Sequence, residues 1–176
     1  MVLRMIALDR GAFEMYLQSD KRTYYSRIIL ILIGVAFGLI AILLNRSVIT
    51  SFDSLLIGMA IVPTLLVCLG ILMVIVTKFG LTLILWAGAR GFGGPGKMRE
   101  VNRSMPVVLI PGVLGVPLLI EYANSFLIVA FLVGMVWMYL MCVRVMEVTQ
   151  QFRRTRAYLS VAMSFLFFVS IYYLLV

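Results

Sequence analysis

Long apolar runs separated by short polar connections dominate the chain. Five runs each approach the roughly 20 residues that an α-helix needs to cross a bilayer core about 30 Å thick. They cover residues 28–44, 55–76, 101–120, 125–145 and 158–176. Lipid offers the backbone no hydrogen-bond partners, so each run should be helical. The expected fold is all-α, with a cytoplasmic amphipathic segment over residues 1–26 and a five-span membrane domain over residues 27–176.

Residues 2–18 show the periodicity of an amphipathic helix. At about 100° per residue, the side chains separate into two faces. The polar face comprises Arg10, Glu14, Gln18 and Lys21, and the apolar face comprises Met5, Ile6, Phe13 and Tyr16. Such a helix lies at a membrane surface or packs on the protein's own cytoplasmic loops, and the pattern leaves both open. Asp9 falls within the apolar face, against the pattern.

The second run does not stop cleanly, because the residues from Phe79 to Ala89 are apolar again. A continuous helix over residues 55–89 would be about 52 Å long at 1.5 Å per residue, which exceeds the bilayer core. The helix should therefore tilt and protrude into the cytoplasm, or bend near Gly80 and follow the interface.

The third run contains three prolines, Pro106, Pro111 and Pro117. An interior proline removes a backbone hydrogen bond and kinks or breaks a helix. We therefore expect a bent or broken span enclosed by neighbouring helices. Broken helices form binding sites in many transporters, so the prolines are a candidate substrate path, although a packed structural kink is the commoner reason for such a pattern.

Lys and Arg are segregated among the predicted connections. Fourteen of the fifteen precede the first run, or lie in the connections between the second and third and the fourth and fifth runs or at the run ends that adjoin them, and Arg46 is the exception. The fourteen are Arg4, Arg10, Lys21, Arg22, Arg27, Lys78, Arg90, Lys97, Arg99, Arg103, Arg144, Arg153, Arg154 and Arg156. With five spans, all fourteen share one side. Because cytoplasmic loops collect Lys and Arg, the N-terminus should be cytoplasmic and the C-terminus outside.

The amino-acid composition supports a membrane protein and excludes several kinds of metal and catalytic site. The chain is 64% hydrophobic and 12% charged, against about half and about a quarter in soluble domains. It has no histidine, which excludes metal sites built on imidazole and the commonest general base. Cys68 and Cys142 both lie in apolar runs, so a disulfide is not expected. No carboxylate falls in the middle of a run, which argues against proton-coupled transport.

A glycine-rich stretch, GARGFGGPGK over residues 88–97, raises the question of a nucleotide. It contains both G-x-G-x-x-G and G-x-x-x-x-G-K. A phosphate loop needs a preceding strand and a Ser or Thr after the lysine, whereas apolar membrane sequence precedes the stretch and Met98 follows Lys97. The sequence therefore favours a tight turn between the second and third runs, and disfavours nucleotide binding.

Two other patterns are typical of helix packing. Gly34 and Gly38 form G-x-x-x-G, whose small residues let helices approach closely, within the chain or with a partner. The other pattern places Met135, Met138, Cys142 and Met146 on one side of the fourth run. Soft sulfur ligands suit Cu(I), but methionine is also a general core filler, and packing is the favoured interpretation. We expect no cofactor.

The cytoplasmic connections carry a basic patch. Its candidate contact residues are Arg99, Arg103, Arg153, Arg154 and Arg156. Such a patch attracts anionic lipid headgroups or docks an acidic partner. Setting the topology is a sufficient role for most of these residues. Nothing indicates nucleic-acid binding.

The order of these features resembles the Yip-domain family, five-span proteins with a cytoplasmic N-terminus. Bacterial members often show a glycine-rich turn, a basic stretch and a proline-containing third span, as in GFGGPGKMREVNRSMPVVLIPGVLG here. They also show a Trp in the fourth span, matched by Trp137 in GMVWMYL, and a basic stretch opening the fifth, matched by RRTRAYL. The similarity begins near residue 12. Eukaryotic members carry a long acidic N-terminal region that this chain lacks, so binding of Rab-type GTPases is not implied.

These observations predict a non-catalytic protein of the bacterial cytoplasmic membrane. It would act as a subunit or scaffold, with membrane lipids and other integral membrane proteins or a second copy as partners. The alternative is a small transporter or channel subunit that uses the kinked third run.

Overall fold

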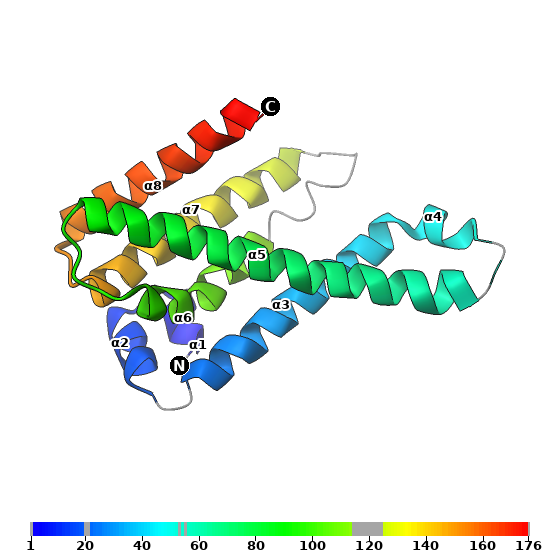
Figure 1. Cartoon of the computed structure of the whole chain (residues 1–176), viewed down its shortest axis with the longest axis horizontal. Helices are drawn as coiled ribbons and strands as arrows, with labels where there is room; N and C mark the ends of the chain where they lie inside the picture. The colour runs from blue at the N-terminus through cyan, green and yellow to red at the C-terminus, as the bar shows by residue number, and fades with distance from the viewer. Residues whose placement is uncertain (1, 20–21, 53, 55, 114–124, 176) are drawn as a thin grey trace.

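The computed structural model describes residues 2–19, 22–52, 54, 56–113 and 125–175. Regular structure in these residues is helical throughout, as the sequence predicts (Figure 1). The elements are α1 (Val2–Ile6), α2 (Arg10–Gln18), α3 (Arg22–Leu44), α4 (Arg46–Thr50), η1 (Ile57–Ile61), α5 (Val62–Gly91), α6 (Met98–Val108), α7 (Ser125–Thr149) and α8 (Arg154–Leu175).

Three helices in the described part of the chain are long and apolar enough to cross a membrane. They are Thr23–Leu44, Ile57–Gly91 and Ser125–Thr149. Their length and composition indicate an integral membrane protein. Five crossings and the orientation stay predictions.

The π-helical turn η1 and α5 form one continuous helix of 35 residues. The helix continues past residue 76, which is the first of the two alternatives that the sequence leaves open for the second run, so Lys78 lies within a helix and not in a connection. Gly80 does not interrupt it. The π turn precedes Pro63, whose missing N–H and bulky ring disturb the regular bonding of the turn before it.

The third run is broken, as its prolines predict. Helix α6 ends at Val108 and contains Pro106, and a 3₁₀ turn that includes Pro111 follows it. Pro117 lies outside the described residues. The helix begins at Met98, upstream of the predicted start at residue 101.

The N-terminal segment is two short helices, so the single helix predicted over residues 2–18 is wrong. The chain turns at Leu8, which has φ of 65°. Asp9 then caps α2, because its Oδ1 accepts a 2.9 Å hydrogen bond from the N–H of Gly11. The carboxylate that conflicted with the apolar face is thus a helix start signal.

Helix α5 is central in the packing. Helix α3 crosses it, α6 contacts both, and α7 and α8 form a second pair that also contacts α5 and α6 (Figure 1). Side chains hold the last pair together. The Tyr139 hydroxyl donates to the carbonyl of Tyr158 at 3.0 Å, and the Tyr139 ring meets Phe165 edge-on.

The main core gathers at one end of the bundle, on the left in Figure 1. We call this the basic end; it comprises residues 2–18 and the connections at 92–97 and 150–153. Helix α6 lies at the centre of the main core, where Val101, Met105 and Val108 are fully buried. Away from this end the pairs α3–α5 and α7–α8 diverge, and their apolar side chains are largely exposed.

Candidate functional site

Gly34 and Gly38 contact α5 within the chain. A Cβ on Gly34 would lie 2.6 Å from the Cα of Ile71, and one on Gly38 would lie 2.5 Å from the Cα of Val67. Gly70 completes the contact, because a Cβ there would lie 2.6 Å from the carbonyl oxygen of Gly34. Three glycines therefore allow the two backbones to touch. The predicted packing motif is used inside the molecule.

The glycine-rich stretch ends α5 in a Schellman turn. The N–H of Gly94 donates to the carbonyl of Ala89 at 2.9 Å, and the N–H of Gly93 donates to the carbonyl of Arg90 at 3.0 Å. Gly93 has φ of +75°, a conformation that favours glycine. These amides are engaged with the end of the helix, so they are not directed at a phosphate.

The next residues dock on the end of α7. The Gly96 N–H donates to Oε1 of Gln150 at 2.9 Å, and the Gly96 carbonyl accepts from Nε1 of Trp86 at 3.3 Å. A Cβ on Gly96 would collide with the carbonyl oxygen of Thr149. The stretch is thus a tight turn, as the sequence favours, and it also clamps the α5–α6 connection onto α7.

Two hydrogen bonds fix the N-terminal helices onto α6 and α7. Nε1 of Trp137 donates to the carbonyl of Ile6 at 2.9 Å, and the Tyr16 hydroxyl donates to the carbonyl of Arg103 at 3.2 Å. Met5, Phe13 and Tyr16 are buried. The apolar face therefore packs on the protein, which resolves the alternative that the sequence leaves open.

The surroundings of Tyr16 show how the N-terminal helices contact the rest of the protein. Burial raises the pKa of its phenol above the ordinary value, while the Ser26 side chain and the positive charge of Arg103 act to lower it. Since Ser26 belongs to α3 and Arg103 to α6, one tyrosine of α2 links three helices.

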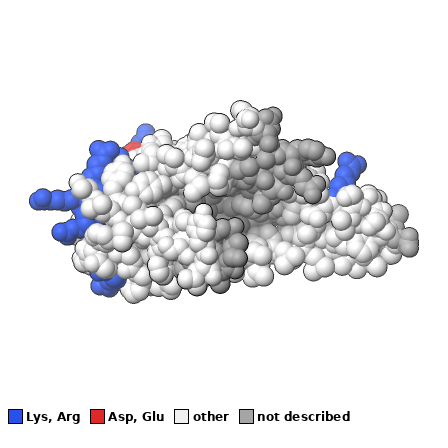
Figure 2. Space-filling view, turned by 90° about the horizontal axis from the view of Figure 1, so that it is seen from above, with Lys and Arg blue, Asp and Glu red and all other residues white. Residues whose placement is uncertain are grey.

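The candidate basic residues collect at the basic end. Figure 2 shows Lys and Arg gathered at one end of the molecule, with a smaller group toward the other. Arg99, Arg153, Arg154 and Arg156 are exposed there, while Arg103 is partly buried. The bond between Gly96 and Gln150 brings their two connections together. Glu147 is separate from this surface, because it is buried and pairs with Arg144 at 2.7 Å.

A largely apolar cleft of about 450 Å³ lies between α5, α7 and α8. We call it the central cleft. Its wall includes Leu81, Leu109, Met135, Met138 and Ser164. The Ser164 hydroxyl donates within α8 to the carbonyl of Ser160 at 2.9 Å. A smaller cavity beside it shares Met135 and Met138 and is also lined by Pro111 and Gly112.

The broken third run therefore borders a cavity. Pro111 lines it, whereas Pro106 is buried inside α6. Of the four sulfur residues, Met135 and Met138 face the clefts, while Cys142 and Met146 belong to the buried core. The four do not face a single cavity, which supports packing.

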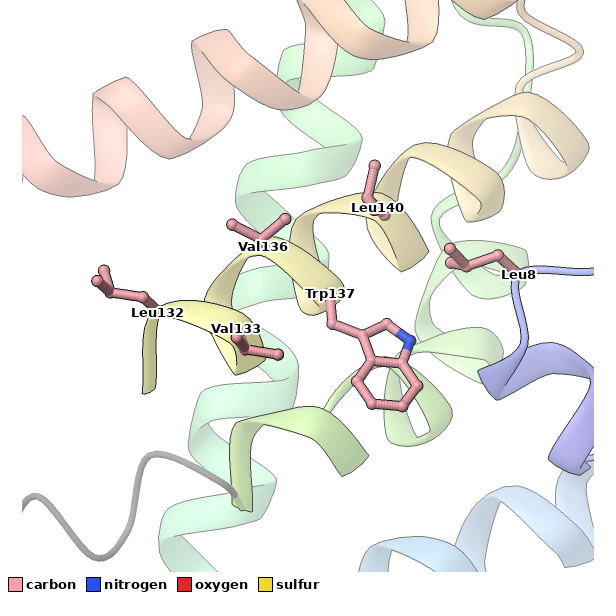
Figure 3. A pocket seen from close by; sticks show the side chains of 6 residues that line it. All are labelled: Leu8, Leu132, Val133, Val136, Trp137 and Leu140. Carbon is pink, nitrogen blue, oxygen red and sulfur yellow. The ribbon is translucent and has the colours of Figure 1, made fainter. Parts of the chain in front are cut away.

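A second open apolar surface lies on α7. We call it the α7 groove; it measures about 440 Å³ and is lined by Leu8, Leu132, Val133, Val136, Trp137 and Leu140 (Figure 3). The turn at Leu8 brings that side chain from the N-terminal segment to the same groove. The sequence singles out Trp137 but gives no sign of the groove, because its wall comes from segments far apart in the chain.

The described residues offer no cluster of three or more His, Cys, Asp or Glu side chains able to hold a metal. Comparison with protein-family models, curated proteins and solved structures finds no match for the chain.

Proposed function

We propose that this chain is a non-catalytic accessory protein of the membrane that binds another integral membrane protein through the α7 groove. The observation that supports this proposal most strongly is the groove itself. Leu8 of the N-terminal segment and the apolar side chains of α7 form one open apolar surface there. An apolar groove of this kind fits an apolar transmembrane helix.

The rigidity of the basic end supports this role. Trp137 lines the groove and also donates to Ile6, so the N-terminal segment and α7 are fixed relative to one another. The surface is therefore preorganised, which reduces the ordering cost of binding. Five spans, a cytoplasmic basic end, a bacterial inner-membrane location and membership of the Yip-domain family are parts of the same proposal. The gathering of cations at one end supports the orientation.

Photo-crosslinking in native membranes tests the accessory role. A photoreactive amino acid replaces Val133 in the groove, and the control replaces Leu69, which is exposed on α5 away from it. We expect a discrete protein adduct from position 133 and only lipid adducts from position 69. The mass of the adduct distinguishes a second copy from another protein. Lipid adducts alone at both positions would contradict the proposal.

The second candidate function is a small transporter or channel subunit. The observation that favours it is the central cleft beside the broken third run. Flux of candidate solutes in proteoliposomes, compared between the native chain and Pro111→Ala, tests it. A transporter shows flux that the substitution reduces, whereas an accessory protein shows none.

A further inference from the structure

Lys78 lies in the middle of the buried face of α5. The buried residues of this helix are Val74, Thr82, Leu85 and Ala89, and with Lys78 they recur at intervals of four, four, three and four residues, which is one helix face. Lys78 itself is partly buried. Its ammonium lies 5.3 Å from the ring centre of Phe79. The structure gives it no ion pair with any described residue.

The contact between α3 and α5 brings Arg27 to the same level. These helices are antiparallel, with Gly34 against Ile71 and Gly38 against Val67. Arg27 precedes Gly34 by seven residues, and Lys78 follows Ile71 by seven. Seven residues are close to two helical turns. Lys78 therefore lies on the face of α5 that is turned toward α3, and Arg27 lies at the exposed edge of the same contact.

Polar groups of α2 and α6 meet at this level. The Thr82 hydroxyl donates to the carbonyl of Lys78 at 2.7 Å and lies 3.5 Å from Oδ1 of Asn102. The next residue, Arg103, accepts from Tyr16, which is also in contact with Ser26. The two ion pairs formed by described acids, at Glu14 and Glu147, involve neither Lys78 nor Arg27.

The side facing away from the basic end is apolar. Leu30, Ile33, Val74 and Leu109 form a buried cluster there. Lys78 thus lies where a cationic layer joins an apolar one. This order, from charge to hydrocarbon, is that of a lipid headgroup and its chains.

We propose that Lys78 and Arg27 bind the phosphate of an anionic phospholipid headgroup at the junction of α3, α5 and α6. A charge in a membrane helix is costly unless it is paired or reaches the interface. Basic pockets between helices bind anionic headgroups, and a lysine binds phosphate as a point charge. The lipid supplies the negative partner that the described residues do not.

Thermal unfolding of the purified full chain in detergent, with titrated lipid, tests the site. The probes are phosphatidylglycerol, phosphatidylcholine and inorganic phosphate. We expect phosphatidylglycerol to raise the midpoint most. Lys78→Met should raise its half-saturating concentration about tenfold, the effect of one charge-assisted hydrogen bond. Arg27→Gln serves as a second variant, so that the test does not depend on one substitution.

Lys97→Met is the matched control, since it removes the same charge from an exposed position at the basic end. It should leave the titration unchanged. Equal titrations for Lys78→Met, Arg27→Gln and the native chain would overturn the proposal, and would mean that Lys78 extends its ammonium to water. Equal stabilisation by inorganic phosphate alone would overturn the lipid assignment in favour of a soluble anion.

Discussion

At the residue scale, single glycines decide how the α5–α6 connection turns. Gly93 supplies the positive φ that ends α5, whereas Gly96 supplies the space that lets the chain reach Thr149 and Gln150. The pattern G-x-G-x-x-G arises here from a helix cap followed by a close contact. A helix cap and a close backbone contact at this spacing thus produce the glycine pattern of a nucleotide-binding motif, although the stretch does not form a phosphate-binding loop.

Gly93→Ala should lower the free energy of unfolding by about 1 kcal/mol, because a residue with a Cβ is strained at positive φ. Gly91→Ala is the control, since Gly91 lies at the end of α5 and nothing lies within 4 Å of a Cβ added there. That change should leave stability unchanged or raise it by up to about 1 kcal/mol. Unfolding by SDS titration measures both. Equal effects would contradict the assigned cap.

At the element scale, the crossing of α3 and α5 depends on backbone contact. Gly38→Ala should destabilise the protein by roughly 1–3 kcal/mol, the usual cost of overpacking. Gly80→Ala on α5, where nothing lies within 4 Å of the added Cβ, should instead stabilise by about 0.5–1 kcal/mol, because alanine favours the helix. The same SDS titration applies. A neutral Gly38→Ala would show that the helices do not touch there.

The N-terminal helices depend on their attachment to α7. Trp137→Phe removes the donor to Ile6 but keeps an aromatic ring. Trypsin should then cleave after the exposed Arg10 several-fold faster, because local opening exposes the segment. Trp86→Phe, which removes a hydrogen bond to Gly96 instead, should leave cleavage at Arg10 unchanged. Equally faster cleavage after Arg10 in both variants would contradict the prediction, because it would indicate a general loss of stability and not the opening of the N-terminal helices alone.

The sequence predicts most of the elements, because apolar runs and prolines act locally. The break after α6 and the amphipathic faces of the N-terminus are examples. It does not predict the contacts that depend on distant segments. Asp9 is out of place on the apolar face of a single helix, but in the structure the chain turns at Leu8 and Asp9 caps α2. Lys78 resembles the end of a span in the sequence, whereas in the structure α5 continues to Gly91 and packs there against α6 and α8.

The candidate site follows the same division. Gly34, Gly38 and the basic residues are visible as short patterns, although the sequence cannot say that the glycines pack within the chain. Gln150 carries no local signal, because its role is defined by Gly96, more than fifty residues earlier in the chain. The two clefts are formed by different helices, so no run of residues could indicate them.

At the scale of the whole molecule, the fold has a well-packed basic end and a divergent opposite end. The core and the N-terminal helices lie at the basic end. The exposed large apolar side chains lie mainly on α3, α5, α7 and α8. This asymmetry supports a protein that holds one end rigid at a membrane surface while its apolar helices meet lipid or other membrane proteins.

The central claim is the orientation of these helices in a membrane, and cysteine labelling tests it most directly. In a chain without Cys68 and Cys142, single cysteines are placed as Ser51→Cys, Lys97→Cys, Ser125→Cys and Gln151→Cys, and intact cells receive a membrane-impermeant maleimide. The proposed topology predicts labelling at positions 51 and 125 in intact cells, and at 97 and 151 only after permeabilisation. Labelling at 97 or 151 in intact cells, or protection of 125 until permeabilisation, would contradict it.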